Sequence, residues 1–371
     1  MISSKYFFVL FFCSSLLVMA QQPNAQVETE INKAGLKFLK NNNINSVSIG
    51  VYKGGQVYTA HFGELVKGSQ KPPTDQTIYE VGSVTKPVTG YLVAKAVKEG
   101  NLSLEDDIRI YLKSDYPNLS FEGSPITVKH LLTHTSGLPL FLPAAMNDLF
   151  TNPKASVPQQ YDKIDKAYSK KAFWEDLKEI KLSAKPGTQY NYSNTGAEII
   201  GHILEDIYKK DFDLLVQEQF ALSLALTNTG MDLNSEQKSR LAQGYWAANA
   251  QASPNQFNSL WGSGSGLKMT LPDILVFAQS QMKQDDPIIA ESQRVLFEQK
   301  TLKMSYFWRV WQDKYGTSFN HHGGTTGMQN WLFVYPDQDL AVSIITNQSD
   351  PKTPQLLGKT ARKLVKELSG I

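Results

Sequence analysis

The chain has 371 residues, of which 41% are hydrophobic and 19% are charged, a balance typical of a soluble globular protein. Intrinsic disorder, collagen-like repeats and coiled coils are therefore excluded as classes. The formal net charge is only +2, so we expect no overall field that attracts nucleic acid, and recognition must depend on a local site.

The first 20 residues have the pattern of a secretory signal. Lys5 gives a positive start, residues 6–18 are apolar, and Ala20 ends a small-residue exit. The apolar stretch is shorter than the ~20 residues of a spanning helix, so we expect no stable membrane span, although a retained anchor is an alternative. The protein is then exported, to the periplasm in a Gram-negative source and otherwise secreted.

The only cysteine, Cys13, lies inside that signal. The mature chain, residues 21–371, therefore has no thiol for disulfides, thiolate metal sites or a cysteine nucleophile.

The two ends of the mature chain predict a sheet with helical covers. A helix is expected over 27–40 and another over 354–368, because apolar residues recur there at helical spacing. Five strands are predicted, of which the first two flank a Gly-Gly turn. They cover residues 46–52, 56–62, 306–311, 329–335 and 340–346.

This pattern predicts an α+β protein with one lobe built from about 21–81 and 304–371. The segment of about 82–303 is then an all-helical lobe, and a site is expected at the seam between the two lobes.

The first candidate catalytic motif is Ser83-Val84-Thr85-Lys86, just before a helical run. Ser-x-x-Lys occurs five times in the chain, at Ser83, Ser235, Ser265, Ser280 and Ser349, so only context distinguishes the copies. At a helix start, free backbone N–H groups favour an oxyanion, and Lys86 returns to the face of Ser83 one turn later.

Two further motifs follow along the chain. Tyr192-Ser193-Asn194 precedes an apolar helix, and His321-His322-Gly323-Gly324 lies between two late strands. Glycine there lets a substrate approach backbone N–H groups.

Taken in order, the three motifs resemble the active-site elements of the serine β-lactamase and penicillin-binding protein superfamily. The resemblance covers nearly the whole mature chain. It is strongest to the branch of class C β-lactamases, D-alanyl-D-alanine carboxypeptidases and related esterases. It implies a five-stranded antiparallel sheet flanked by the terminal helices, beside an all-helical lobe.

The resemblance also implies residue roles. Ser83 is the nucleophile, Lys86 its activating partner and Tyr192 the general acid or base. Substrate is held by Asn194, His321, Gly323 and Gly324, and the N–H groups of Ser83 and Gly324 form the oxyanion hole.

The reaction needs no metal or cofactor. The substrate is a small molecule or a peptidoglycan-type peptide, and we expect a monomer. From the residues alone, either Lys86 or Tyr192 can be the first proton acceptor, since both are protonated at neutral pH unless shifted. A β-lactam, a D-alanyl-D-alanine peptide and an ester all stay open as the substrate.

His321 stands where class C enzymes carry the lysine of Lys-Thr-Gly. At its ordinary pKa of about 6.5 it is mostly neutral at pH 7 and charged near pH 5, so we expect weakened carboxylate binding at neutral pH.

Two alternatives belong to other classes. A zinc hydrolase could use His130 and His134, but Leu131 replaces the glutamate of the metalloprotease motif. A non-catalytic cell-wall sensor on the same fold would usually lack the nucleophile, lysine or tyrosine, all of which are present here.

Overall fold

Strands from both ends of the chain form one antiparallel sheet in the computed structural model, which describes residues 14–42, 44–246 and 251–369. The sheet has eight strands in the order β2-β1-β14-β13-β12-β11-β10-β9. Their bounds are β1 (Ser46–Lys53), β2 (Gln56–Gly63), β9 (Phe297–Gln299), β10 (Leu302–Met304), β11 (Arg309–Asp313), β12 (Gly316–Gly324), β13 (Gln329–Tyr335) and β14 (Leu340–Thr346).

The predicted antiparallel sheet is confirmed, but five strands are too few. Sequence reasoning missed β9, β10 and β12. Glycines and polar residues dominate β12, so its local preference for a strand is weak. It is a strand because it pairs with β11 on one side and β13 on the other.

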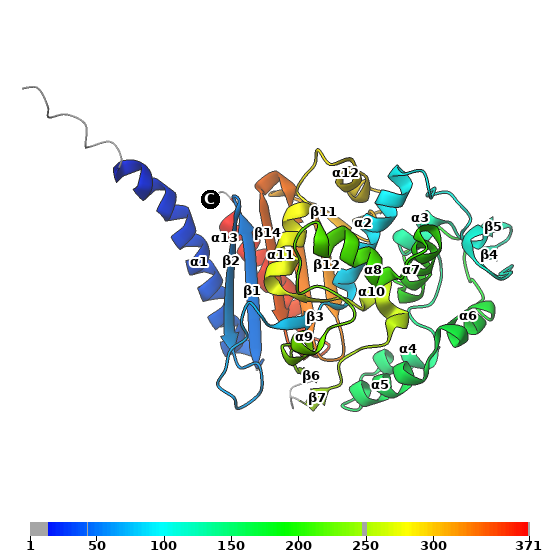
Figure 1. Cartoon of the computed structure of the whole chain (residues 1–371), viewed down its shortest axis with the longest axis horizontal. Coiled ribbons are helices and arrows are strands. Elements are labelled where there is room, and N and C mark those ends of the chain that lie inside the picture. The colour runs from blue at the N-terminus through cyan, green and yellow to red at the C-terminus, as the bar shows by residue number, and fades with distance from the viewer. Residues whose placement is uncertain (1–13, 43, 247–250, 370–371) are drawn as a thin grey trace, which may run out of the picture.

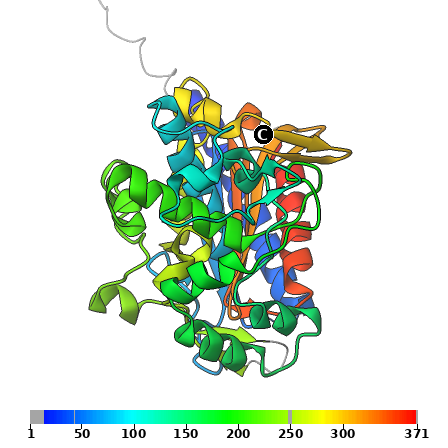
Figure 2. The same ribbon diagram turned by 90° about the vertical axis from the view of Figure 1, so that its right-hand side faces the viewer.

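The two terminal helices cover one face of this sheet, as predicted. They are α1 (Ser14–Asn42) and α13 (Thr353–Leu368), which contact each other. Val27, Ile31 and Phe38 of α1 are buried with Val342 and Ile344 of β14 in one hydrophobic cluster. Figure 1 shows α1 continuing beyond the sheet, and Figure 2 shows α1 and α13 together at one side of the molecule.

Helices from the middle of the chain cover the opposite face and extend beyond it (Figure 1). They are α2 (Thr85–Lys98), α3 (Val128–Leu132), α4 (Ala145–Thr151), α5 (Val157–Ala167), α6 (Lys170–Lys178), α7 (Asn194–Tyr208), α8 (Phe212–Val216), α9 (Ser235–Ser239), α10 (Gly262–Ser265), α11 (Leu271–Ser280) and α12 (Pro287–Gln293).

The middle segment is not all helical. Its strand β8 (Lys268–Thr270) pairs with β3 (Ile78–Glu80), and further short strands pair as β4 (Ser120–Phe121) with β5 (Ser124–Pro125) and β6 (Gly244–Trp246) with β7 (Gln251–Ser253) and β15 (Gln348–Ser349). Helix α11 packs directly on β1, where a side chain at Gly50 would lie 2.7 Å from Leu275 Cδ1. The predicted boundary between the lobes is therefore bridged by α11.

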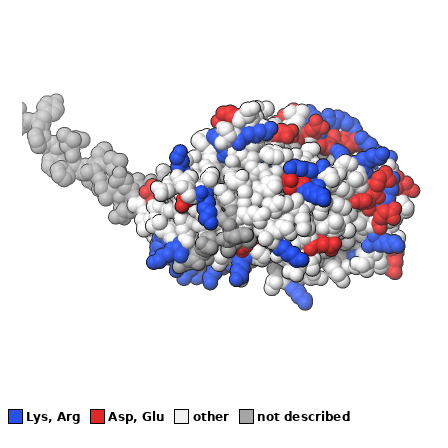
Figure 3. All heavy atoms as spheres, turned by 90° about the horizontal axis from the view of Figure 1, so that it is seen from below, with Lys and Arg blue, Asp and Glu red and all other residues white. Residues whose placement is uncertain are grey.

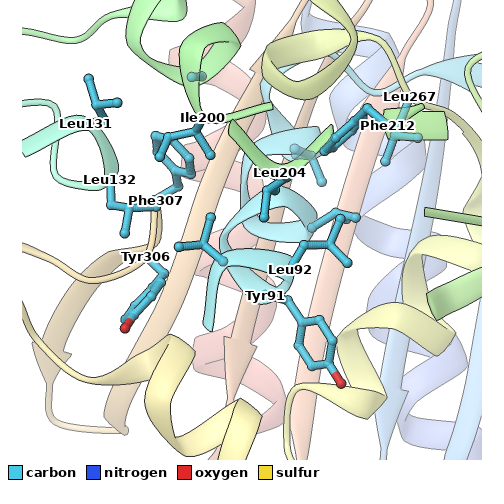
Figure 4. Close-up of a cluster of buried hydrophobic side chains, with 14 of the residues drawn as sticks. Tyr91, Leu92, Leu131, Leu132, Ile200, Leu204, Phe212, Leu267, Tyr306 and Phe307 are labelled. Carbon is cyan, nitrogen blue, oxygen red and sulfur yellow. The ribbon is translucent and has the colours of Figure 1, made fainter. Parts of the chain in front are cut away.

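Residues 306–311 do not form one strand as predicted. The strand begins only at Arg309, and Phe307 adopts a left-handed φ of 64°. Phe307 N donates to Leu132 O over 3.0 Å, which ties this stretch to α3. Its aromatic side chains have the pattern of a strand, but they are buried in the helical core around α2 and α7 (Figure 4).

No single charge sign dominates the face drawn in Figure 3. Acidic and basic side chains are mixed over its right half, and basic ones prevail along the lower left margin. Within residues 14–42, 44–246 and 251–369, no helix is both long and apolar enough to cross a membrane. Residues 1–13 of the predicted signal lie outside the described residues, whereas its residues 14–20 belong to α1.

Gly90→Ala tests the packing of α2 against the 305–308 segment. Alanine favours a helix by about 1 kcal/mol over glycine. A Cβ at Gly90, however, would lie 2.2 Å from Tyr306 O, a backbone atom that cannot rotate away. We therefore expect Gly90→Ala to lower the free energy of unfolding by about 1–3 kcal/mol in urea titrations.

Gly196→Ala is the matched control, because its Cβ would be no nearer than 3.4 Å to any neighbouring atom. We expect this helical glycine to be replaced without loss of stability. Equal or greater stability of Gly90→Ala would contradict the close packing described above.

Candidate active site

Ser83 lies where β3 turns into α2. A short 3₁₀ turn, Gly82–Val84, precedes the helix, so Ser83 stands just before the predicted helix start. Gly82 has a left-handed φ of 51°, and a side chain there would lie 2.7 Å from Gly324 N. Only glycine lets the turn approach the end of β12 so closely.

Two neighbouring strands hold the residue before this turn. Asn330 Nδ2 of β13 donates to Val81 O over 2.9 Å. A side chain on Gly323 would lie 2.0 Å from the same oxygen. The backbone that carries Ser83 is therefore fixed against the sheet.

Lys86 is fully buried and points at Ser83. Its Nζ donates to Ser83 Oγ over 3.1 Å, to Asn194 Oδ1 over 2.6 Å and to Gly264 O over 2.8 Å. Burial lowers the pKa of Lys86 to about 7, against an opposing effect of the Glu198 carboxyl group. Near neutral pH, a large share of Lys86 is therefore a free amine that can accept a proton.

Tyr192 meets Ser83 from the loop before α7. Ser193 caps this helix by accepting from Gly196 N over 2.9 Å, and its hydroxyl donates to Pro139 O over 2.7 Å. Tyr192 lines the same cavity as Ser83, and Lys86 Nζ lies 4.9 Å from the centroid of its ring. Burial raises the pKa of Tyr192 above its usual range, so the phenol keeps its proton at neutral pH.

His321 is not placed as its expected role requires. It is 1% exposed and does not line the cavity beside Ser83. Its Nδ1 donates to His322 O over 2.7 Å, and burial, followed by the charges of Arg309 and Lys86, holds its pKa well below the usual range. This burial opposes the expectation that His321 is charged near pH 5, because that expectation assumed a solvated ring.

The neighbouring His322 faces the cavity instead. Its Nε2 is 2.7 Å from Gln329 Oε1, and burial lowers its pKa to about 4. Neither histidine supplies a positive charge at neutral pH.

Arg309 at the start of β11 supplies the positive charge. It is half-buried and lines the cavity together with Ser83 and Tyr192. Among the described residues, no acidic side chain forms a salt bridge with Arg309. Sequence reasoning missed Arg309 because it stands in an aromatic run. A lone arginine within such a run was the one feature that could have marked it as a site residue.

The cavity beside Ser83 has a volume of about 420 Å³. Its polar lining residues include Ser83, Tyr192, Asn194, Arg309, His322, Gly324 and Asp350. Its apolar wall is formed by Leu140, Phe141, Phe150, Pro153, Tyr161 and Trp246, of which Phe141, Phe150 and Tyr161 have rings in mutual contact. Asn147 fixes this apolar wall, because it both donates to and accepts from the backbone of Phe141.

A larger cavity of about 670 Å³ lies between α6, α7 and residues 111–116. It contains the pair His202 and Glu205 but no serine beside a base. The lining residues, and not the volume, therefore identify the cavity beside Ser83 as the candidate active site.

The two histidines of the zinc alternative have other partners. His130 Nδ1 accepts from Thr127 N over 3.1 Å and caps α3, whereas His134 Nδ1 accepts from Ser193 N over 3.2 Å. Helix α3 ends at Leu132, so the two rings do not share a helix face. In the portion of the chain that the structure describes, no group of three candidate metal ligands is found.

Comparison with known proteins points to one family. A family model described as Beta-lactamase matches residues 27–366. A Beta-lactamase of Providencia stuartii is 27% identical over 276 residues, which is 74% of this chain and 65% of that protein. The D-alanyl-D-alanine-carboxypeptidase/endopeptidase AmpH of Escherichia coli strain K12 is 28% identical over 238 residues, 63% of this chain and 57% of that protein.

The chain spans less than two thirds of the length of these curated relatives. Among solved structures, the Beta-lactamase/D-alanine Carboxypeptidase of Yersinia pestis complexed with citrate superposes with a TM-score of 0.77 at 20% identity, over 93% of this chain and 99% of that one. A class C beta lactamase gives a TM-score of 0.75, also at 20% identity, over 92% of this chain and 98% of that one. The fold is thus that of these two enzymes, and by its match over residues 27–366 the chain belongs to the beta-lactamase family.

Proposed function

We propose that this protein is an exported serine hydrolase that acts through an acyl-enzyme on β-lactams or D-amino-acid amides. One observation carries the proposal: Ser83 Oγ lies 3.1 Å from the buried Lys86 Nζ, whose pKa is lowered to about 7. A serine hydroxyl becomes a nucleophile when a neighbouring base removes its proton. Export rests on Lys5 and the apolar stretch 6–18 alone.

In the proposed acylation step, Ser83 Oγ attacks the carbonyl carbon while Lys86 Nζ takes the hydroxyl proton. Backbone N–H groups of Ser83 and Gly324 stabilise the oxyanion. The neutral Tyr192 phenol then protonates the leaving nitrogen, the scissile C–N bond breaks, and Lys86 returns its proton to the tyrosine.

Deacylation reverses these roles. Water attacks the Ser83 ester while Tyr192 takes its proton and passes its own proton to Lys86; the ester C–O bond then breaks, and the proton on Lys86 goes to Ser83 Oγ. The two groups thus act as one proton carrier. Lys86 is the first acceptor in this proposal, because burial lowers its pKa and raises that of Tyr192.

Arg309 supports a substrate with a carboxylate near the scissile bond. Among the residues that line the cavity it is the only Lys or Arg, and no acidic side chain of the described residues forms a salt bridge with it, including Asp350 of the same lining. Penicillins, cephalosporins and D-alanyl-D-alanine peptides all carry such a carboxylate. We therefore transfer the carboxylate-binding role from His321 to Arg309.

A carboxylesterase is the second candidate. The apolar wall around Phe141 and Phe150 favours it, because an alkyl or aryl acyl group would pack there without needing Arg309.

Ser83→Ala tests the nucleophile. Incubation with a fluorescent penicillin or a nitrophenyl ester, followed by mass spectrometry, is expected to give one covalent adduct on the wild type and none on this variant. Ser265→Ala is the matched control, because Ser265 also lines the cavity and also begins a Ser-x-x-Lys motif, yet we expect its adduct to be unchanged. An adduct on Ser83→Ala, or a wild type that reacts with neither reagent, would contradict the proposal.

Arg309→Gln tests carboxylate recognition. Hydrogen bonds to a charged group contribute about 1.5–3 kcal/mol, so kcat/KM for a cephalosporin should fall by roughly 10- to 100-fold relative to a neutral nitrophenyl ester. The ratio of the two substrates cancels any effect of Arg309 on the pKa of Lys86. Arg294→Gln, which removes an exposed arginine paired with Glu291, should leave the ratio unchanged. Equal losses on both substrates in Arg309→Gln would exclude a carboxylate-binding role.

A further inference from the structure

A buried carboxyl group interacts electrostatically with Lys86 and has no part in the steps above. Glu198 is on α7, one helical turn after Asn194, and is 3% exposed. A buried acid without a salt-bridging cation is costly unless it is protonated or hydrogen-bonded. The Glu198 carboxyl group accepts from the Ser263 hydroxyl over 3.0 Å and lies 3.4 Å from His202 Nε2.

Through Ser263, this carboxyl group reaches the backbone that holds Lys86. Ser263 is followed by Gly264, whose carbonyl accepts from Lys86 Nζ over 2.8 Å. Thr89 Oγ1 of α2 donates to Ser263 O over 2.7 Å, one turn beyond Lys86. The same turn is therefore bound to Glu198 on one side and to the helix of Lys86 on the other.

The turn fits closely against α7. A side chain on Gly201 would lie 2.3 Å from Ser263 Oγ, and one on Gly264 would lie 3.6 Å from Ala197 Cβ. Asn194 and the Gly264 carbonyl thus contact Lys86 directly, and Glu198 is joined to them through Ser263.

We propose that Glu198 is a positioning residue for Lys86, which holds the Ser263–Gly264 turn against its ammonium group and, when ionised, favours the protonated form of Lys86. This inference rests on the proposed function, because it assigns Glu198 a part in preparing the base of that reaction.

The charges that reach Glu198 support this role. They come from Lys86 on α2, Lys170 on α6 and Glu205 on its own helix. His202 lies between Glu198 and Glu205 and contacts both carboxyl groups. Burial lowers the pKa of His202, so at neutral pH its ring is uncharged and does not compete with Lys86 for Glu198. Glu205 accepts from Lys170 over 2.9 Å and lies 2.9 Å from His202 Nδ1, so its charge already has partners.

Glu198 and Lys86 then titrate as a pair. Burial raises the pKa of Glu198 to about 8, against the opposing hydrogen bond from Ser263, and burial lowers that of Lys86 to about 7. With the proton on Glu198, Lys86 is a free amine and can act as a base. When Glu198 ionises, its negative charge raises the pKa of Lys86 and favours the ammonium form.

Glu198→Gln tests the inference directly. Protein labelled with ¹³C at the lysine ε-carbon is titrated by NMR, and the Lys86 signal is identified by its loss in Lys86→Ala. Because glutamine cannot ionise, the Lys86 midpoint should move down by up to about one pH unit and the alkaline tail of its curve should disappear. Glu198→Asp, which keeps the charge, should retain the tail.

Asp206→Asn is the matched control, because it removes an exposed carboxylate from the same helix and should leave the curve unchanged. An unchanged Lys86 curve in Glu198→Gln would overturn the inference even if the enzyme is active. The titration needs no substrate, so it tests the inference even if the protein turns over no substrate. A failure to turn over substrate would instead count against the proposed function.

Ser263→Ala is the second variant if Glu198→Gln melts well below the wild type. Loss of the Ser263 hydroxyl favours protonated Glu198, so the Lys86 midpoint is again expected to fall.

Discussion

The burial of one ammonium group, that of Lys86, is the constraint on which the site depends. Water would hold this side chain charged well above neutral pH. Inside the protein it loses that hydration and receives in return two neutral oxygens, from Asn194 and Gly264, beside the hydroxyl of Ser83. No carboxylate among the described residues forms a salt bridge with it, so desolvation dominates and a base becomes available near pH 7.

This environment requires both lobes. The helical part brings Lys86, Tyr192 and Asn194 together through α2 and α7, while the sheet fixes the backbone before Ser83 through Asn330. Gly82 and Gly323 make that junction possible, since side chains at either position would overlap the opposing backbone. The geometry of the candidate site is therefore a property of the junction, and neither lobe alone would exclude water from Lys86.

Part of this could be predicted from the sequence, because spacing encodes local structure. Apolar periodicity correctly predicted the terminal helices and a sheet built from both chain ends. The order of the three motifs indicated the family, and that resemblance implied the antiparallel arrangement. Strand β12 was missed because tertiary pairing outweighs the weak local preference of its glycines and histidines.

Part of the candidate site could likewise be predicted from the sequence. Ser83, Lys86, Tyr192 and Asn194 do come together, since each belongs to a motif with a local structural signal. The orientation of His321 was not predictable, because one step along a strand moves a side chain from the cavity to the core. Arg309 and Glu198 carry no motif at all, and only the packing of distant segments brings them to Ser83 and Lys86.

The pH dependence of the acylation rate tests the central claim most directly. With a neutral nitrophenyl ester in a stopped-flow instrument, the titration of the substrate carboxylate is avoided and the first burst reports Ser83 acylation. If Lys86 is the base, its protonated form is inactive, so the rate should rise with pH through a midpoint within about one unit of pH 7. A midpoint above about pH 9, where an ordinary lysine or tyrosine titrates, would contradict a desolvated Lys86 as the origin of catalysis.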